Sequence, residues 1–436
     1  MNPSSPILTE FSGRSGQILE RLNQLYPALI DLSLDRLKRL LKDLGNPEQK
    51  LPPIIHVAGT NGKGSVCAYL RAIGEAANLR VHVSTSPHLV DVTERFRIAG
   101  KLVSEEKLAQ TLEVIEQVNK GQPITVFEVL TAAAFLLFSQ TPADLAIIEV
   151  GLGGRFDATN VITPIACAIT SISMDHEAFL GNSLERIAGE KAGIIKASVP
   201  VTTDYQQPEV LEILKKESEI LHAPLKTRNQ DWFIEQKGDL LFYKDDKGEL
   251  TLPPPSLSGA HQISNAGLAI ATLRASSLNL PQSAWSGITK AQWPARFQQL
   301  HGNLTTNFSK DWEIWLDGGH NPGAGQAIAT MLKTHWQDRP IHLIVGMKQT
   351  KNADAFLAPL LPFAKTIQAV VETDQHLAMP INAIIKASRN QAKEGPTVKA
   401  ALQKIMQTEK QPGRILICGS LYLAGSVLKQ DGWKAT

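Results

Sequence analysis

A glycine-rich segment near residue 60 carries the residue types that bind phosphate groups. An apolar run at 54–58 predicts a buried strand, and a helix is expected from about 66 to 77. Between them lie Gly59, Thr60, Asn61, Gly62, Lys63, Gly64 and Ser65. Glycines let backbone N–H groups approach phosphate oxygens, and the start of the helix adds its positive dipole end. Lys63 would reach the outer phosphates, and Ser65 would offer a hydroxyl to a magnesium ion.

The spacing of this loop departs slightly from the common phosphate-binding loop. Gly64 separates Lys63 from Ser65, whereas the common pattern places the hydroxyl residue directly after the lysine. An ordinary glycine-rich turn is the alternative. The strand before the loop and the helix after it favour phosphate binding.

Three further predicted strands end in polar residues that could serve the same chemistry. Ser86 ends a strand at 80–86, Glu149 lies at the end of 144–150, and His176 follows 165–171. In a doubly wound α/β sheet, ligands bind beyond the carboxyl ends of the strands. A buried carboxylate such as Glu149 needs a cation or hydrogen-bond donors. Magnesium prefers oxygen ligands, so His176 is equally well explained as a hydrogen-bonded turn residue.

The elements that position these residues alternate between strand and helix, which predicts a doubly wound α/β domain. Helical spacing is found from Ile18 to Leu44 with an interruption near Pro27, and helices are also predicted at 104–119, 125–139, 184–195 and from about 261. Alternation at 233–242, broken at 246–248, predicts a β-hairpin. Residues 1–20 are polar and uninformative.

A second, smaller α/β domain is predicted after Trp293-Pro294. Short apolar strands occur at 313–317, 341–345, 367–371 and 414–418, and a helix begins near Gly323. We therefore expect a first domain at 1–294, a linker at 295–301 and a second domain at 302–436.

The composition is that of a globular protein with ample material for a large core. Of 436 residues, 43% are hydrophobic and 20% charged, and the net charge of +2 argues against nucleic-acid binding. Cys67, Cys167 and Cys418 lie far apart in apolar segments, as reduced core cysteines do. No signal core or membrane-spanning run occurs in the sequence, so a cytoplasmic protein without membrane contact is expected.

Together, several motifs closely resemble folylpolyglutamate synthase and the bifunctional dihydrofolate synthase, members of the Mur ligase superfamily. The motifs that carry the resemblance lie at 56–65, 85–89, 94–98, 127–131, 149–160, 175–176, 190–193, 261–266, 293–296, 317–322 and 418–422. The resemblance implies a P-loop-containing central domain and a smaller Rossmann-like C-terminal α/β domain. Ala295 stands where the family commonly has glycine, and Arg296 after it is retained.

The resemblance also implies roles for residues that look ordinary by themselves. The implied metal ligands are Ser86, Glu149 and His176, beside the hydroxyl of Ser65. Lys191 matches a lysine that is carbamylated in this superfamily. The implied ATP contacts in addition to the phosphate loop are Asn265, Arg296, Asp317 and His320. The implied pterin contacts are Asp31, Leu32, Ser33, Thr125, Val126, Phe127, Glu128, Phe156, Asp157 and Ala158.

The activity implied is an ATP- and Mg²⁺-dependent ligation of L-glutamate to a folate carboxylate through an acyl phosphate. Lys63, Lys191, His176 and Arg296 would be the catalytic residues, in an enzyme expected to be a monomer. A muramyl ligase acting on a UDP-linked peptide is the alternative enzyme, although only about 50 residues precede the phosphate strand. A nucleotide-dependent binding or switch protein is the alternative from another class. Whether dihydropteroate, reduced folates or both are accepted is left open.

Overall fold

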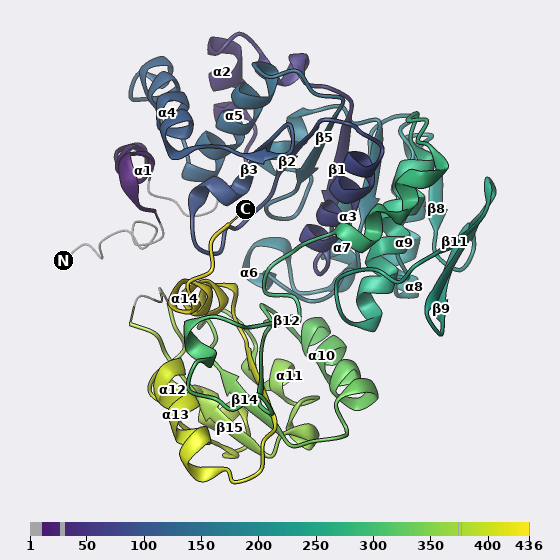
Figure 1. Ribbon diagram of the computed structural model, residues 1–436. Coiled ribbons are helices and arrows are strands. Elements are labelled where there is room, and N and C mark those ends of the chain that lie inside the picture. The colour runs from purple at the N-terminus through teal and green to yellow at the C-terminus, as the bar shows by residue number, and fades with distance from the viewer. Residues whose placement is uncertain (1–10, 27–30, 374, 376, 436) are drawn as a thin grey trace.

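The computed structural model describes residues 11–26, 31–373, 375 and 377–435, and these residues form two lobes (Figure 1). The larger lobe is built on an eight-stranded sheet with the order β4-β3-β2-β5-β1-β6-β7-β8. The strands are β1 Ile54–Ala58, β2 Val81–Ser84, β3 Phe96–Ile98, β4 Lys101–Leu102, β5 Leu145–Glu149, β6 Ala166–Ile169, β7 Val201–Thr203 and β8 Leu225–Thr227. All pairs are parallel except those of β3, which pairs antiparallel with β2 and β4.

The predicted doubly wound α/β class is confirmed by this sheet and by the helices on both of its faces. The helices of the lobe are α1 Gly13–Leu25, α2 Asp35–Asp43, α3 Lys63–Ala76, α4 Glu105–Asn119, α5 Val126–Ser139, α6 Glu177–Leu180, α7 Leu184–Ala192, α8 Pro208–Ile220 and α9 Ala260–Ala275. Alternate residues of β5 belong to different hydrophobic cores: Leu145 and Ile147 to one, Ala146 and Ile148 to the other. A strand directs successive side chains to opposite faces, so each face of the sheet buries its own core.

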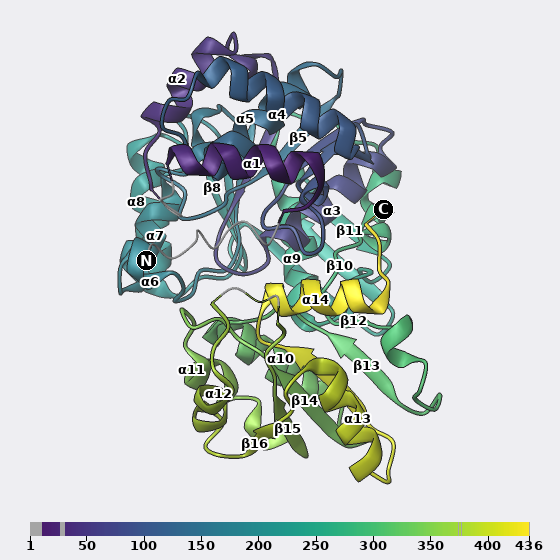
Figure 2. The same cartoon turned by 90° about the vertical axis from the view of Figure 1, so that its left-hand side faces the viewer.

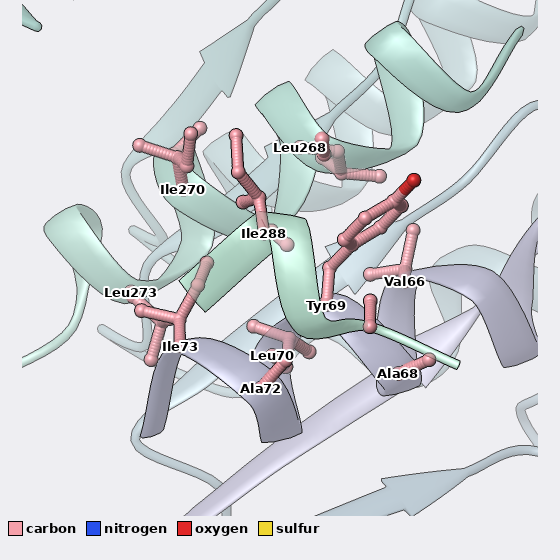
Figure 3. Close-up of a cluster of buried hydrophobic side chains, with 14 of the residues drawn as sticks. Val66, Ala68, Tyr69, Leu70, Ala72, Ile73, Leu268, Ile270, Leu273 and Ile288 are labelled. Carbon is pink, nitrogen blue, oxygen red and sulfur yellow. The ribbon is translucent and has the colours of Figure 1, made fainter. Parts of the chain in front are cut away.

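One of these cores lies between α3 and α9. Figure 3 shows Val66, Tyr69 and Ile73 of α3 facing Leu268 of α9 and Ile288 of the 3-10 segment Gln282–Lys290. These side chains are almost completely buried. The packing fixes the N-terminal ends of α3 and α9 side by side, which matters for the site described below.

Several boundaries differ from the sequence-based expectation. Helix α3 begins at Lys63 rather than near Val66, because Gly62 adopts φ +94° and ends the loop directly before the lysine. Polar residues from Gly13 onward form α1, whose apolar side faces α4. The expected interruption near Pro27 lies outside the described residues. Helix α4 begins after Ser104, whose hydroxyl accepts a hydrogen bond from Lys107 N.

The predicted hairpin is part of a three-stranded antiparallel sheet. Its strands are β9 Trp232–Lys237, β10 Leu240–Asp245 and β11 Gly248–Leu252. The turn before Gly248 lies where the sequence predicts it, and a second, unpredicted turn lies at Gly238, which has φ +58°. A glycine flanked by charged residues was the available signal for that second turn.

The smaller lobe carries a six-stranded sheet with the order β12-β13-β17-β14-β15-β16. Its strands are β12 Gln298–Gln299, β13 Glu313–Leu316, β14 Ile341–Val345, β15 Thr366–Ala369, β16 Ala392–Glu394 and β17 Arg414–Cys418. Its helices are α10 Pro322–His335, α11 Ala353–Leu357, α12 Ile381–Ala387, α13 Val398–Thr408 and α14 Leu421–Asp431. The edge strand β12 falls within the expected linker 295–301 and pairs antiparallel with β13.

The two lobes touch closely along α14. A Cβ atom added to Gly425 of α14 would lie 2.0 Å from the carbonyl oxygen of Leu89, so the larger lobe's loop after β2 rests on this helix. The segment after α14 returns to the larger lobe (Figures 1 and 2). All three cysteines are buried and free, and none of the helices in the described part of the chain could span a membrane.

Candidate active site

The order of the sheet gathers the four predicted strand ends. Strands β2, β5, β1 and β6 are consecutive neighbours and run parallel, so the segments after them meet at one edge. These segments carry Ser86, Glu149, the phosphate loop and His176. The sequence predicted a residue or loop with possible catalytic or binding roles after each of these strands, and the strand order places the four at the same edge of the sheet.

The phosphate loop is held by hydrogen bonds within the loop and by one residue that is distant in sequence. Lys63 Nζ donates hydrogen bonds to the carbonyl oxygens of Gly59, at 3.2 Å, and Thr60, at 3.3 Å. A Cβ atom on Gly64 would lie 2.4 Å from the ring of Trp293. The unusual glycine between Lys63 and Ser65 is therefore explained by Trp293, which lies shortly before the expected linker and packs on the start of α3.

Helix α9 supports the loop from the other side. Ser65 Oγ accepts a hydrogen bond from Gln262 Nε2 at 3.2 Å, and Gln262 Oε1 accepts one from Asn265 Nδ2 at 3.0 Å. Asn265 also lies against Gly62. The predicted nucleotide contact Asn265 is thus connected to the loop through Gln262, which sequence reasoning named only as part of a motif.

Glu149 and Ser86 form a direct pair. The backbone N–H of Ser86 donates to Glu149 Oε2 at 3.0 Å, and the carboxylate is 5% exposed. Burial raises the pKa of Glu149, and the positive charges of Lys63 and Arg296 only partly oppose that effect. A buried carboxylate needs a cation or hydrogen-bond donors, and the Ser86 N–H is the backbone donor to Glu149 here. Glu149 could therefore bind a metal ion as an oxygen ligand.

His176 lies at the start of α6 with φ +53°, and its side chain is 43% exposed. Its neighbour Asp175 is 9% exposed and contacts the smaller lobe: Lys351 Nζ lies 2.5 Å from Oδ1, and His320 Nε2 lies 3.6 Å from Oδ2. Although burial opposes it, these partners hold the pKa of Asp175 well below its usual range. Sequence reasoning singled out His176 and gave no role to Asp175.

Lys191 is buried on α7, where Nζ donates to the Gly59 carbonyl oxygen at 2.8 Å. Burial, followed by the positive charge of Lys63, lowers the pKa of Lys191 to about 7. Lys191 looks like an ordinary solvated lysine in the sequence, whereas the structure buries it. With a pKa of about 7, a substantial fraction of Lys191 is neutral near pH 7, and the neutral amine is a nucleophile.

The smaller lobe and the linker add Arg296, Asp317 and His320. Asp317 is 5% exposed and accepts hydrogen bonds from Phe297 N at 3.0 Å and Gly319 N at 2.7 Å. His320 Nδ1 lies 2.8 Å from the Gly318 carbonyl oxygen. Arg296 donates to its neighbour's carbonyl oxygen and lines, with Ser86 and Glu149, a cavity of about 560 Å³ between the lobes.

The residue before Arg296 has a strained backbone. Ala295 is fully buried and adopts φ +55°, a region in which a Cβ atom is unfavourable. Its carbonyl oxygen accepts from Gly318 N at 2.9 Å and from Arg296 Nη1 at 2.8 Å. The departure from Trp-Pro-Gly-Arg therefore leaves Arg296 in place at the expense of local strain.

The segments proposed for the pterin are joined by a residue that the sequence analysis missed. Arg36 of α2 donates to Asp31 Oδ2 at 2.9 Å and to Glu128 Oε2 at 3.1 Å. Glu128 also completes a capping box with Thr125 at the start of α5. Its Oε1 is buried and has no hydrogen-bond partner among the residues that the structure describes. No local pattern could have linked Arg36 to Glu128, 92 positions away.

The remaining residues proposed to contact the pterin differ in solvent exposure and in whether their polar groups are already hydrogen-bonded. Phe156 is 46% exposed, and Phe127 packs against the loop at Gly151. By contrast, the Asp157 carboxylate is buried and accepts hydrogen bonds from Leu152 N and Thr159 N within its own loop. Four candidates are only partly or little exposed, namely Leu32, Ser33, Val126 and Ala158.

The side chains around Glu149 fit a magnesium ion that is shared with phosphate oxygens better than one held by protein groups alone. Among residues 11–26, 31–373, 375 and 377–435, no three His, Cys, Asp or Glu side chains are grouped to hold a metal ion. Magnesium, however, is commonly bound by one or two protein oxygens together with phosphate oxygens and water. The Ser86–Glu149 pair beside the phosphate loop fits that mode of binding, and His176 is not drawn into a cluster with Glu149.

Comparisons with known proteins agree with this fold. Residues 57–273 match the family model described as Mur ligase middle domain, and residues 300–430 match dihydrofolate synthetase, C-terminal domain. A dihydrofolate synthase/folylpolyglutamate synthase of Bacillus subtilis is 34% identical, over 91% of this chain and 94% of that protein.

Solved structures match over nearly the whole chain. Escherichia coli FolC in complex with DHPP and ADP has a TM-score of 0.87 and 30% identity, covering 96% of this chain and 97% of that one. A bifunctional folylpolyglutamate synthase/dihydrofolate synthase with Mn, AMPPNP and L-glutamate bound has a TM-score of 0.84 and 32% identity, covering 94% and 97%. Nucleotide and a divalent metal are thus bound by relatives.

The fold, with its phosphate loop and second α/β lobe, defines an ATP-dependent ligase of the Mur ligase superfamily. The expected fold class is confirmed. The chain belongs to the dihydrofolate synthase/folylpolyglutamate synthase family, which adds glutamate to folates with ATP.

Proposed function

We propose that the protein joins L-glutamate to both dihydropteroate and reduced folates, with ATP and Mg²⁺. The observation that carries this proposal is the shared cavity in which the linker's Arg296 faces Ser86 and Glu149. Two bifunctional relatives, from Bacillus subtilis and Escherichia coli, match over at least 91% of this chain. The bifunctional activity of these relatives favours two acceptors over one.

The proposed reaction has two steps. The acceptor carboxylate attacks the γ-phosphorus of ATP, ADP leaves, and an acyl phosphate forms. The amine of glutamate then attacks the acyl carbon, phosphate leaves, and the amine proton is released. Lys63 and Arg296 are proposed to stabilise charge on the phosphoryl group, since positioning and electrostatics dominate phosphoryl transfer.

The nucleotide is proposed to lie on the phosphate loop, with Asn265, Asp317 and His320 around its nucleoside. A magnesium ion held by Ser65, Ser86 and Glu149 would neutralise phosphate charge when bound. His176 stays a predicted further ligand, although the described structure does not group it with Glu149. Lys191 is proposed to be carbamylated, and its pKa of about 7 supports this because carbon dioxide reacts with the neutral amine. The carbamate would add an anion beside Gly59 that could support the metal site.

The pterin is proposed to bind between Asp31, Glu128 and Phe156. Glu128 Oε1, which has no hydrogen-bond partner in the part of the chain that the structure describes, can accept a hydrogen bond from a ring N–H or amino group of a pterin. Phe156 is exposed and can stack on the ring. Asp157 is proposed to shape this pocket through its loop, since its carboxylate is already hydrogen-bonded there.

The test is glutamate-dependent ADP release by purified protein with ATP and Mg²⁺. Dihydropteroate and tetrahydrofolate are supplied in separate reactions, and we expect turnover with each. Turnover with tetrahydrofolate alone would restrict the activity to polyglutamate synthesis. A UDP-muramyl peptide is the comparison substrate for the alternative ligase, and no turnover with any acceptor would favour a nucleotide-binding switch. The monomeric state and cytoplasmic location stay predictions.

A further inference from the structure

The side chain of Asn321 connects the smaller lobe to two loops of the site. Its Oδ1 accepts hydrogen bonds from Ala324 N at 2.9 Å and Asn61 Nδ2 at 3.1 Å. Its Nδ2 donates to Asn61 Oδ1 at 2.9 Å and to Asp175 Oδ2 at 3.0 Å. An asparagine amide offers two acceptor and two donor positions, and all four are used here.

Each partner of Asn321 has a separate position in the site. Asn61 belongs to the phosphate loop and also donates to Ser173 Oγ at 3.1 Å. Asp175 directly precedes His176, and Ala324 lies in the first turn of α10. The side chain of Asn321, which is 2% exposed, therefore joins two segments of the larger lobe to the first turn of α10 in the smaller lobe. The two segments are the phosphate loop and the segment after β6.

The backbone around Asn321 is shaped for this close approach. A Cβ atom on Gly323 would lie 2.9 Å from Asn61 Nδ2 and 3.0 Å from Ser173 Oγ, so a larger residue would separate the lobes. Lys351, which follows β14, adds a second link through its ion pair with Asp175.

We propose that Asn321 is a positioning residue that couples docking of the smaller lobe to the order of the phosphate loop and of the segment carrying His176. When the lobes separate, Asn61 and Asp175 lose their shared partner. When the lobes meet, the Asn321 amide fixes Asn61 and Asp175. Arg296 and Asp317 are then placed near the proposed nucleotide position. The kinetic test of this inference rests on the proposed function, and the scattering test does not.

The decisive variant is Asn321→Asp, which keeps the shape and the helix cap but loses both donors and places a carboxylate against Asp175. We expect kcat to fall roughly 10- to 100-fold, because small displacements of reacting groups have effects of that size. The KM for the folate acceptor, whose proposed pocket lies in the larger lobe, should change by less than about twofold.

A second variant and a control separate this role from folding. Asn321→Ser retains a capping hydroxyl without the amide bridge, and it should also lower kcat. Thr397→Ala removes the cap of α13, a helix of the smaller lobe, where Thr397 Oγ1 accepts a hydrogen bond from Ala400 N. It should lower thermal stability while kcat is unchanged.

Small-angle scattering with Mg²⁺ and AMPPNP tests the docking without turnover. We expect a larger radius of gyration for Asn321→Asp than for the wild type under these conditions. Equal scattering profiles together with an unchanged kcat would overturn the proposal. If the wild type turned over none of the acceptors, the proposed function would fail, whereas the scattering comparison would still decide whether Asn321 holds the lobes together.

Discussion

Lys191 and Gly59 are 132 positions apart, yet Lys191 Nζ donates a hydrogen bond to the Gly59 carbonyl oxygen at 2.8 Å. The same oxygen accepts from Lys63 Nζ at 3.2 Å. Two cationic side chains thus converge on one carbonyl at the base of the phosphate loop. Their repulsion, added to burial, explains why Lys191 gives up its proton easily.

Replacing Lys191 with alanine should abolish most activity, by at least about 10²-fold, the scale of losing one preorganised group. Short carboxylic acids such as formate or acetate should restore part of it, because they return an anion to the vacated position. Steady-state ADP release with and without added acid measures the effect. Full activity of the Lys191→Ala variant without any acid would contradict a role for the carbamate.

The pH dependence of the same lysine has a definite sign. Because the folded-state pKa of Lys191 is about 7, against 10.5 ordinarily, its neutral fraction increases as pH rises from 6 to 8. Carbamate formation should therefore increase over this window, as read by NMR with ¹³C-bicarbonate. The uncarbamylated protein should also gain stability between about pH 7 and 10.5, since the unfolded chain holds the extra proton there.

Lys63→Ala should remove activity almost completely, by roughly 10²- to 10³-fold, because no other side chain in the loop supplies a cation to the phosphates. The fold should persist, since both hydrogen bonds that Lys63 Nζ donates in the described part of the chain stay within its own loop. Turnover and AMPPNP binding are the measurements, with Lys333→Ala on the exposed side of α10 as the control. Turnover like that of the wild type would refute the site.

Glu149→Gln should separate stability from function. Burial raises the pKa of Glu149, so its ionised form destabilises the folded chain above the ordinary carboxyl range, and a neutral amide removes this cost. We expect a higher melting temperature without ligand and a loss of the stabilisation by Mg²⁺ with AMPPNP. Thermal unfolding with and without these ligands measures both. A variant stabilised by the metal complex as strongly as the wild type would rule out Glu149 as a ligand.

Ala295→Gly should stabilise the protein by about 0.5–1 kcal/mol. Relief of a left-handed alanine is worth roughly 1–2 kcal/mol, and the greater freedom of glycine in the unfolded chain offsets part of it. Urea unfolding followed by tryptophan fluorescence measures the shift. Activity should be unchanged, because Arg296 keeps its position. A destabilised glycine variant would show that Ala295 is not strained.

Gly64→Ala should reduce activity by at least about tenfold, because the new methyl group collides with Trp293 and displaces the linker that carries Arg296. Gly189→Ala in α7 is the matched control, since an added Cβ there meets no atom within 4 Å. That control should be neutral or slightly stabilising. The kinetics of the two variants give the comparison, and equal activities would mean that Trp293 can move freely.

Local sequence patterns were sufficient to identify the α/β class and the residues at the strand ends. Apolar runs marked β1, β5, β14 and β17, and the glycine and lysine spacing after β1 marked the phosphate loop. The family motifs also identified Lys191, Arg296 and Asp317. These features could be predicted because periodicity, turn residues and short motifs depend on neighbours in the chain.

Only the tertiary structure decided how those residues meet. The neighbour order β2-β5-β1-β6, the burial of Lys191 and the bridge from Arg36 to Glu128 all join segments far apart in sequence. The same holds for Asn321, whose amide links Asn61 and Asp175 across the lobes. Burial, pKa shifts and shared hydrogen bonds arise from packing between distant segments, and no local pattern of residues specifies that packing.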